Sequence, residues 1–175
     1  DIISMTPTTA QSGNNTISMT LKNAGYNTIG AQTFTLKYKI NNGSWVSESF
    51  VVSATWNPGE TKTHNISTQW NVTKDTAYQV CVKIDPQLTN DADTIDELCQ
   101  TVWVGMKGTY TIGVGTYDFQ SFSEAVDALY IRGVLDTVIF NVQAGTYTDN
   151  VNLDGVITGP TGSYPVTFNG QNKAN

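Results

Sequence analysis

The stretch Tyr78–Val104, with the sequence YQVCVKIDPQLTNDADTIDELCQTVWV, has the pattern of two strands joined by an acidic loop. In each strand, apolar residues alternate with polar residues or cysteines, which is the two-residue period of a strand with one buried face. If Cys81 lies opposite Cys99, Val82 faces Leu98, so apolar side chains gather on one face and both sulfurs on the other. The stretch therefore predicts an antiparallel hairpin that completes a fold formed by the preceding strands.

Cys81 and Cys99 are the two cysteines of the chain, and the predicted hairpin places them side by side. A disulfide between them would stabilise the fold by about 3 kcal/mol, because it restricts the unfolded chain. Two free thiols and a metal site are the alternatives. The metal site is the poorer of the two, because no further cysteine exists and His64 is the single histidine.

The loop of the predicted hairpin is crowded with carboxylates. Asp91, Asp93 and Asp96 lie between Asp85 and Glu97, and oxygen ligands spaced this closely can bind Ca²⁺. The spacing is not that of an EF-hand. A solvated acidic loop without metal is the alternative, although a cation would relieve the repulsion between the carboxylates. Asp91, Asp93 and Asp96 are thus candidate calcium ligands, and no other cofactor is expected.

The composition is that of a mostly β protein with few charges. Charged residues make up 14% of the 175 residues, against about 25% in ordinary globular domains. The net charge is -6 and Arg132 is the single arginine, so no nucleic acid partner is expected and no anionic membrane surface either. No apolar run approaches the ~20 residues that span a bilayer, so no membrane insertion is expected. The chain begins at Asp1 rather than Met, so we expect upstream sequence outside this chain.

Residues 1–104 have the pattern of an immunoglobulin-like β-sandwich. About seven short strands are separated by turn signals at intervals of roughly ten residues, as in Greek-key sandwiches. The turn signals include Asn41-Asn42-Gly43, where Asn and Gly accept positive φ. Strands are expected at residues 1–5, 16–22, 33–40, 45–52, 61–66 and in the hairpin 78–104.

Two short turn motifs give residues 1–104 a family resemblance. Asn23-Ala24-Gly25 forms an early "NxG" turn, Pro58-Gly59-Glu60 forms a "PGE" turn in the middle, and the cysteine-containing hairpin with its acidic loop follows. In these features the segment resembles the CARDB-type immunoglobulin-like domain, in the version found in large secreted proteins of Bacteroidota. The resemblance implies adhesion or spacing between other domains, with no catalytic residues.

Residues 105–108 are expected to be a linker, and residues 109–175 have a different pattern. Ser121 and Glu124 form a capping-box signature, in which the serine accepts a hydrogen bond from the helix amides. A helix follows over 122–132, with an apolar face, and Gly133 is suited to end it. Strands are expected at residues 109–112, 137–142, 147–153 and 166–169.

The order of cap helix, strand, "AGTY" turn and strand in residues 109–175 resembles the start of a pectin-lyase-like right-handed parallel β-helix. The resemblance implies a cap helix followed by the first coil of a solenoid. One coil cannot bury its own face, because each repeat of a solenoid packs on its neighbours. We therefore expect either further coils beyond Asn175 or a partner chain that covers the open end.

The sequence offers no catalytic constellation, and the chain is expected not to be an enzyme. His64 lies in a polar strand without a nucleophile elbow nearby, and Asp149 and Asp154 have no basic partner in the sequence around them. A modification signal is present instead. Three Asp-Thr-apolar tripeptides resemble the O-glycan acceptor of Bacteroidota, which makes three threonines candidate O-glycosylation sites: Thr76, Thr94 and Thr137.

The leading functional hypothesis is a non-catalytic module of a large secreted protein on the extracellular cell surface. It would act as an adhesin or rigid scaffold, in keeping with the resemblance to type IX-secreted proteins that include gliding adhesins. Expected partners are other domains of the same large chain, with secretion machinery or surface polysaccharide as further candidates. One alternative is an accessory region of a polysaccharide-degrading enzyme whose catalytic coils lie downstream. Another is a subunit of a self-assembling filament.

Overall fold

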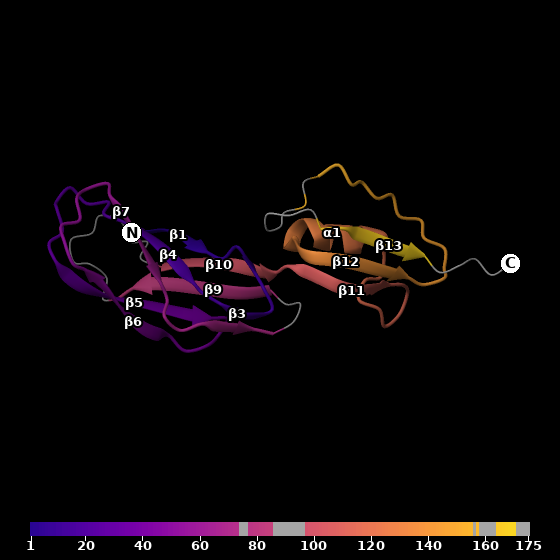
Figure 1. The fold of residues 1–175 in the computed structure, drawn as a ribbon, viewed down its shortest axis with the longest axis horizontal. Coiled ribbons are helices and arrows are strands. Elements are labelled where there is room, and N and C mark those ends of the chain that lie inside the picture. The colour runs from indigo at the N-terminus through magenta and orange to yellow at the C-terminus, as the bar shows by residue number, and fades with distance from the viewer. Residues whose placement is uncertain (74–76, 86–96, 156, 158–163, 171–175) are drawn as a thin grey trace. The chain divides into compact units, whose positions relative to one another are not determined.

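A computed structural model describes residues 1–73, 77–85, 97–155, 157 and 164–170 of the chain. The fold is mostly β, with thirteen strands and one helix among these residues (Figure 1). The chain divides into two compact units, Asp1–Trp103 and Val104–Asn175. Each unit has buried apolar residues of its own.

Unit 1 contains three sheets. Their strand orders are β1-β4-β7, β2-β10-β9-β5-β6 and β3-β8. The strands are β1 (Ile2–Thr6), β2 (Thr9–Ala10), β3 (Gly13–Asn15), β4 (Ser18–Lys22), β5 (Gln32–Ile40), β6 (Val46–Val52), β7 (Thr61–Asn65), β8 (Trp70–Val72), β9 (Ala77–Ile84) and β10 (Glu97–Val104).

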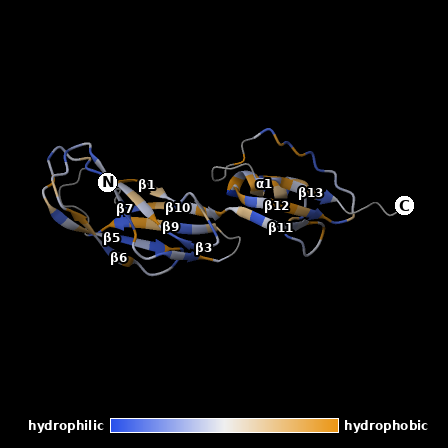
Figure 2. Ribbon diagram, in the orientation of Figure 1, coloured by the Kyte–Doolittle hydropathy of each residue, from blue (hydrophilic) through white to orange (hydrophobic). Residues whose placement is uncertain are grey.

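The alternating pattern in the sequence accounts for the strands of the larger sheets (Figure 2). In β5, Phe34, Leu36 and Tyr38 are buried, while the residues between them are partly exposed. The turn after β5 uses Asn41 at a φ of 52°, a left-handed conformation that Asn accepts more readily than most residues. This turn returns the chain into β6, as the sequence predicts.

The hairpin of β9 and β10 has the predicted register. Cys81 pairs with Cys99, Val82 with Leu98 and Tyr78 with Val102. A shift by one residue would expose the apolar side chains and bury the polar ones. The hairpin lies inside the five-stranded sheet, with β5 on one side and β2 on the other.

The three-stranded and five-stranded sheets both contribute buried residues to the core of unit 1, an arrangement compatible with a β-sandwich. Side-chain contacts join the sheets directly. Phe50 of β6 packs edge-on against His64 of β7, with ring centroids 5.4 Å apart, and the Gln100 amide of β10 donates to the carbonyl oxygen of Met5 in β1 at 3.2 Å. The core includes Met5, Ile17, Met19, Leu21, Phe34, Leu36, Phe50, Val52, Val80, Val82 and Val102.

Glu48 ties the edges of the two sheets together. Its carboxylate lies 2.9 Å from His64 Nε2 and accepts hydrogen bonds from the backbone N–H and the hydroxyl of Ser67. Because an ionised carboxylate can only accept, the imidazole must place its proton on Nε2 in this contact. One carboxylate on β6 therefore satisfies three donors on and after β7.

Replacing Glu48 with alanine is expected to destabilise unit 1 by about 1–2 kcal/mol, because three donors lose their acceptor. All four tryptophans lie in unit 1, so denaturant unfolding followed by tryptophan fluorescence reports the change. Ser49→Ala, an exposed change on the same strand, is the control. Equal stability of the two variants would contradict the role of Glu48.

The turn after Trp56 is closed by hydrogen bonds between Asn57 and Glu60. The Asn57 backbone N–H donates to Glu60 Oε2 at 2.8 Å, and the Asn57 side-chain amide donates to Oε1 at 3.1 Å. These two hydrogen bonds, the backbone one first, lower the pKa of the Glu60 carboxyl. A lowered pKa means that the turn is more stable with Glu60 ionised.

Asn57→Ala is expected to raise the pKa of Glu60 part of the way to its ordinary value of 4.5, because the backbone donor remains. The stabilisation is fully present above that ordinary value and is lost as the pH falls through the lowered pKa. An NMR pH titration of the Glu60 side chain measures the shift. Lys62→Gln is the matched control and should change the pKa less, because the Lys62 charge is the weakest contribution. A larger shift in the control would overturn this assignment.

Unit 2 is a three-stranded parallel sheet with one helix. The sheet order is β11-β12-β13, and both strand pairs are parallel. The elements are β11 (Met106–Ile112), α1 (Phe122–Arg132), β12 (Val134–Val142) and β13 (Val166–Gly170).

Helix α1 has the predicted caps. Ser121 Oγ accepts a hydrogen bond from the Glu124 backbone N–H at 3.1 Å, and Gly133 ends the helix at a φ of 71°, with its N–H donating to the Leu129 carbonyl oxygen. The Glu124 carboxylate differs from the expected capping box, because it accepts from the Gln120 N–H. The cap is therefore shared by two residues before the helix.

Aromatic side chains stack across the parallel sheet. Tyr110, Phe140 and Phe168 occupy matching positions on β11, β12 and β13. The rings of Phe140 and Phe168 are stacked 4.8 Å apart, and those of Tyr110 and Phe140 are 5.8 Å apart. Phe140 is fully buried, so it forms the centre of this core together with Leu129 of α1.

Two sequence expectations for this region differ from the structure. Met106 and Gly108, expected in a linker, lie in β11, because Met106 pairs with Val134 and Gly108 with Val138. Residues 147–153, expected as a strand, pair with no strand. Side chains hold this segment instead, since the Asp149 carboxylate accepts from the N–H of Phe122 at the start of α1.

Candidate interaction surface

The outer face of the five-stranded sheet gathers the chemically distinctive side chains of unit 1. We call it the disulfide face, and it consists of Lys37, Lys39, Trp45, Cys81, Lys83, Glu97 and Cys99. Strands β5, β9 and β10 lie side by side here in the order β10-β9-β5. Alternate residues of each strand point to the side opposite the core, which brings the six strand residues to one surface. Trp45 lies just before β6 and contacts Lys39 and Lys83 of that surface.

Strand register arranges the disulfide face in rows. One row holds Lys37, Lys83 and Glu97 from β5, β9 and β10. The next row holds Lys39, Cys81 and Cys99. Lys37 and Lys83 are directly opposite each other in the first row, and like charges in such a pair repel. Nearby carboxylates are therefore needed to offset the repulsion between these two lysines.

The predicted disulfide between Cys81 and Cys99 is present. It joins directly opposed residues of β9 and β10, which have Cα atoms 4.0 Å apart. Cys81 is 1% exposed, whereas Cys99 lies on the exposed side of β10. The disulfide therefore lies on the outer face of the sheet, with Cys81 buried and Cys99 exposed to solvent.

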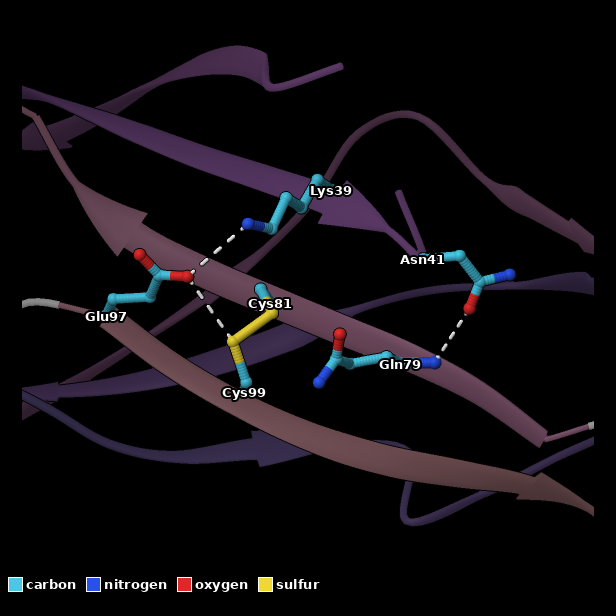
Figure 3. The surroundings of a disulfide bond; sticks show 6 residues. All are labelled: Lys39, Asn41, Gln79, Cys81, Glu97 and Cys99. Carbon is cyan, nitrogen blue, oxygen red and sulfur yellow. Dashed lines mark hydrogen bonds and ion pairs between the residues drawn. A yellow bond between two sulfur atoms is a disulfide. The ribbon is translucent and has the colours of Figure 1, made fainter. Parts of the chain in front are cut away.

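Among the described residues, acidic side chains pair with Lys37 and Lys39 on the disulfide face. Lys39 Nζ lies 3.6 Å from Glu97 Oε1, and Figure 3 shows these two groups pointing toward each other beside the disulfide. Lys37 forms an ion pair with Asp85. The hydrogen bond from Lys37, with the charges of Lys37 and Lys83, lowers the pKa of the Asp85 carboxyl.

Trp45 provides an aromatic surface for two of the lysines. The ammonium groups of Lys39 and Lys83 lie 4.3 Å and 4.7 Å from the centre of its ring. Cations at this distance are attracted by the electron-rich ring. The disulfide face thus combines three cationic groups with an aromatic ring in a chain of net charge -6.

The candidate calcium ligands Asp91, Asp93 and Asp96 lie outside the described residues. The acidic residues at the two ends of that loop are described. Asp85 follows β9 and pairs with Lys37, and Glu97 begins β10 and pairs with Lys39.

Of the candidate O-glycosylation sites, Thr76 and Thr94 also lie outside the described residues. Thr137 lies in the parallel strand β12 and is partly buried. Its backbone N–H donates to Asp136 Oδ1 at 2.7 Å.

His64 has an acidic neighbour and a serine nearby, but in the wrong order for a catalytic triad. The Glu48 carboxylate contacts both His64 and Ser67, and the Ser67 hydroxyl donates to that carboxylate at 3.1 Å. In a triad the imidazole lies between the hydroxyl and the carboxylate and removes the hydroxyl proton. Asp149 likewise has a structural partner, the first turn of α1.

Five members of the disulfide face were not predicted as site residues from the sequence: Lys37, Lys39, Trp45, Lys83 and Glu97. Glu97 was assigned to the acidic loop, and nothing in the sequence connected Lys39 or Trp45 with the cysteines. The usable signal for Glu97 was its spacing of two residues from Cys99, which puts both side chains on one face of a strand.

No helix among the described residues is long and apolar enough to cross a bilayer. No family model matches the sequence, and a comparison with curated proteins found no significant match.

Proposed function

We propose that this chain is a non-catalytic module of a large secreted protein on the extracellular cell surface, where it acts as an adhesin or rigid scaffold. The observation that carries the proposal is the Cys81–Cys99 disulfide across a sheet of a mostly β unit. Disulfides persist in oxidising surroundings outside the cytoplasm. A cross-linked sheet also suits a part that must keep its shape while exposed to proteases.

Contacts between the two turn motifs support the CARDB-type immunoglobulin-like assignment for residues 1–104. The backbone N–H of Asn23 donates to the Glu60 carbonyl oxygen at 3.0 Å, and the Gly59 N–H donates to the Asn23 carbonyl oxygen at 2.7 Å. The buried Asn23 side chain also donates to the carbonyl oxygen of Trp56. Two motifs more than thirty residues apart in the sequence are therefore joined by hydrogen bonds. This contact explains why both motifs would be present in one domain.

The parallel sheet of unit 2 supports the assignment of residues 109–175 to the start of a parallel β-helix. Stacked rings on successive strands and an Asn141–Asn169 side-chain hydrogen bond at 3.3 Å are the kind of ladder that such a solenoid needs. Helix α1 packs against the same core, as a cap would. In this proposal the unit begins a rigid stalk that continues with the other domains of the large chain.

The disulfide face is the surface that we assign to binding in this proposal. Lys39, Lys83 and Trp45 offer cations and a ring, which suit the carboxylates and the apolar faces of an acidic surface polysaccharide. Charge attraction of this kind weakens as salt rises. Binding to an acidic polysaccharide that falls with salt and with Lys39→Gln/Lys83→Gln would support this surface, whereas unchanged binding by that variant would place the partner elsewhere.

Antibody labelling of the source cells tests the proposed location. Labelling of intact cells by an antibody raised against the 175-residue chain is expected, with little increase after permeabilisation. Labelling that requires permeabilisation would contradict the surface role. An inert cytoplasmic protein followed in the same cells provides the control for leakage.

A further inference from the structure

Three possible metal ligands meet on the disulfide face. The ligand atoms of Cys81, Glu97 and Cys99 all lie within 4.8 Å of one another. Glu97 Oε1 lies 3.4 Å from Cys99 Sγ, and Figure 3 shows the carboxylate directed at the disulfide. A disulfide sulfur carries no proton, so this approach is a close contact of two electron-rich atoms and not a hydrogen bond from sulfur.

Strand geometry alone brings these three groups together. Cys81 and Cys99 are directly opposed on β9 and β10, and Glu97 precedes Cys99 by two residues on the same face. Two of the ligands therefore belong to one strand and the third to its neighbour. The paired backbones keep the three Cβ positions fixed, so the arrangement does not depend on the disulfide bond itself.

The chemistry of the three groups selects a metal class. Two thiolates and one carboxylate, with a water molecule as the fourth ligand, match the tetrahedral coordination of Zn²⁺. Calcium and magnesium are poor matches, because they bind oxygen ligands. The bound ion would leave one net negative charge, which Lys39 at 3.6 Å from the carboxylate would offset.

We propose that the Cys81–Cys99 pair has two alternative states: a disulfide when oxidised, and a zinc-class metal site with Glu97 when reduced. The site follows from the pairing of β9 and β10 and is independent of the proposed surface role. A chain that is still reduced would hold its two reactive thiols as metal ligands. Oxidation would then release the ion and close the disulfide.

The two states are connected by a balanced reaction. A phosphine reductant with one water molecule gives the phosphine oxide and two thiols, and each thiol then loses its proton to solvent when the ion binds. In the reverse direction a small-molecule disulfide takes two electrons from the two thiolates. It takes two protons from solvent and leaves as two thiols, the metal returns to solvent, and the bond between the two sulfurs forms.

Cobalt titration of the full 175-residue chain tests the proposal. The protein is reduced with a phosphine and titrated with Co²⁺ alone, which gives a thiolate-to-cobalt absorption band, and then with Zn²⁺, which should displace it. One ion per reduced chain is expected, with no band for the oxidised chain. Circular dichroism and tryptophan fluorescence establish that the reduced chain is folded. A reduced chain that unfolds, or that stays folded without binding, would overturn the proposal.

Two substitutions distinguish a site with three protein ligands from metal binding by the two thiols alone. Glu97→Gln removes one ligand and should weaken Co²⁺ binding by about tenfold or more. Even residues that only hydrogen-bond to metal ligands change the metal affinity by about tenfold or more when they are replaced. Asp85→Asn removes a carboxylate that pairs with Lys37 and is not one of the three ligands, so it should leave the affinity unchanged. Equal binding by Glu97→Gln and the wild type would show that the thiols alone hold the ion, and would refute the three-ligand site.

Discussion

Replacing Phe140 with alanine is expected to destabilise unit 2 by about 3–5 kcal/mol, the range for removing a buried phenylalanine. Phe140 is fully buried, and its ring contacts those of Tyr110, Phe119 and Phe168. The cavity would be lined by rings held on three parallel strands and the loop before α1. Paired strands cannot easily move to fill such a cavity, so the surrounding rings should not recover most of the packing that Phe140 provides.

Hydrogen exchange measured by mass spectrometry should detect the loss in peptides from α1 and β12. Tryptophan fluorescence does not report on unit 2, because all four tryptophans lie in unit 1. Ile139→Ala is the matched control, since Ile139 is the next residue of β12 and only partly buried. A loss for Phe140→Ala no larger than that for Ile139→Ala would contradict the aromatic core.

Reducing the disulfide, or replacing both cysteines with alanine, is expected to destabilise unit 1 by about 3 kcal/mol. The bond closes a loop with a sequence separation of 18 between Cys81 and Cys99, and cross-linking removes conformations from the unfolded chain. The register of β9 and β10 also extends over seven residue pairs, so the folded sheet should survive without the bond. The effect should therefore fall on stability and not on the fold.

Denaturant unfolding with tryptophan fluorescence measures this loss, with and without a phosphine reductant in metal-free buffer. The double variant Cys81→Ala/Cys99→Ala supplies the control, because the reductant should not change its midpoint. A wild-type midpoint that is insensitive to reduction would contradict the stabilising role. A midpoint that recovers when Zn²⁺ is added to the reduced wild type, but not to the double variant, would agree with the proposed metal site.

The sequence predicted the features that depend on local patterns. Alternating apolar residues placed β5 and the register of β9 with β10, because a slip of one residue would have exposed Val82 and Val102. Ser121 and Gly133 marked the ends of α1, since helix ends favour these residue types. The disulfide followed from the same register.

Contacts between distant segments were not predictable from one sequence. Residues 147–153 were expected to form a strand, but the Asp149 carboxylate accepts a hydrogen bond from the start of α1 instead. Glu97 looked like part of an acidic loop, and its pairing with Lys39 depends on three strands meeting in one sheet. The residues that form the disulfide face therefore come from separate stretches of the sequence between Lys37 and Cys99.

The oxidation state of Cys81 and Cys99 in the native protein tests the central claim most directly. Source cells are treated intact with an alkylating reagent, and the protein is then digested without reduction and examined by mass spectrometry. A peptide pair linked through Cys81 and Cys99, with neither residue alkylated, is the predicted result for a disulfide-locked module outside the cytoplasm. Recovery of both cysteines in alkylated form would contradict that account and would mean that the reduced state is the working state of the protein.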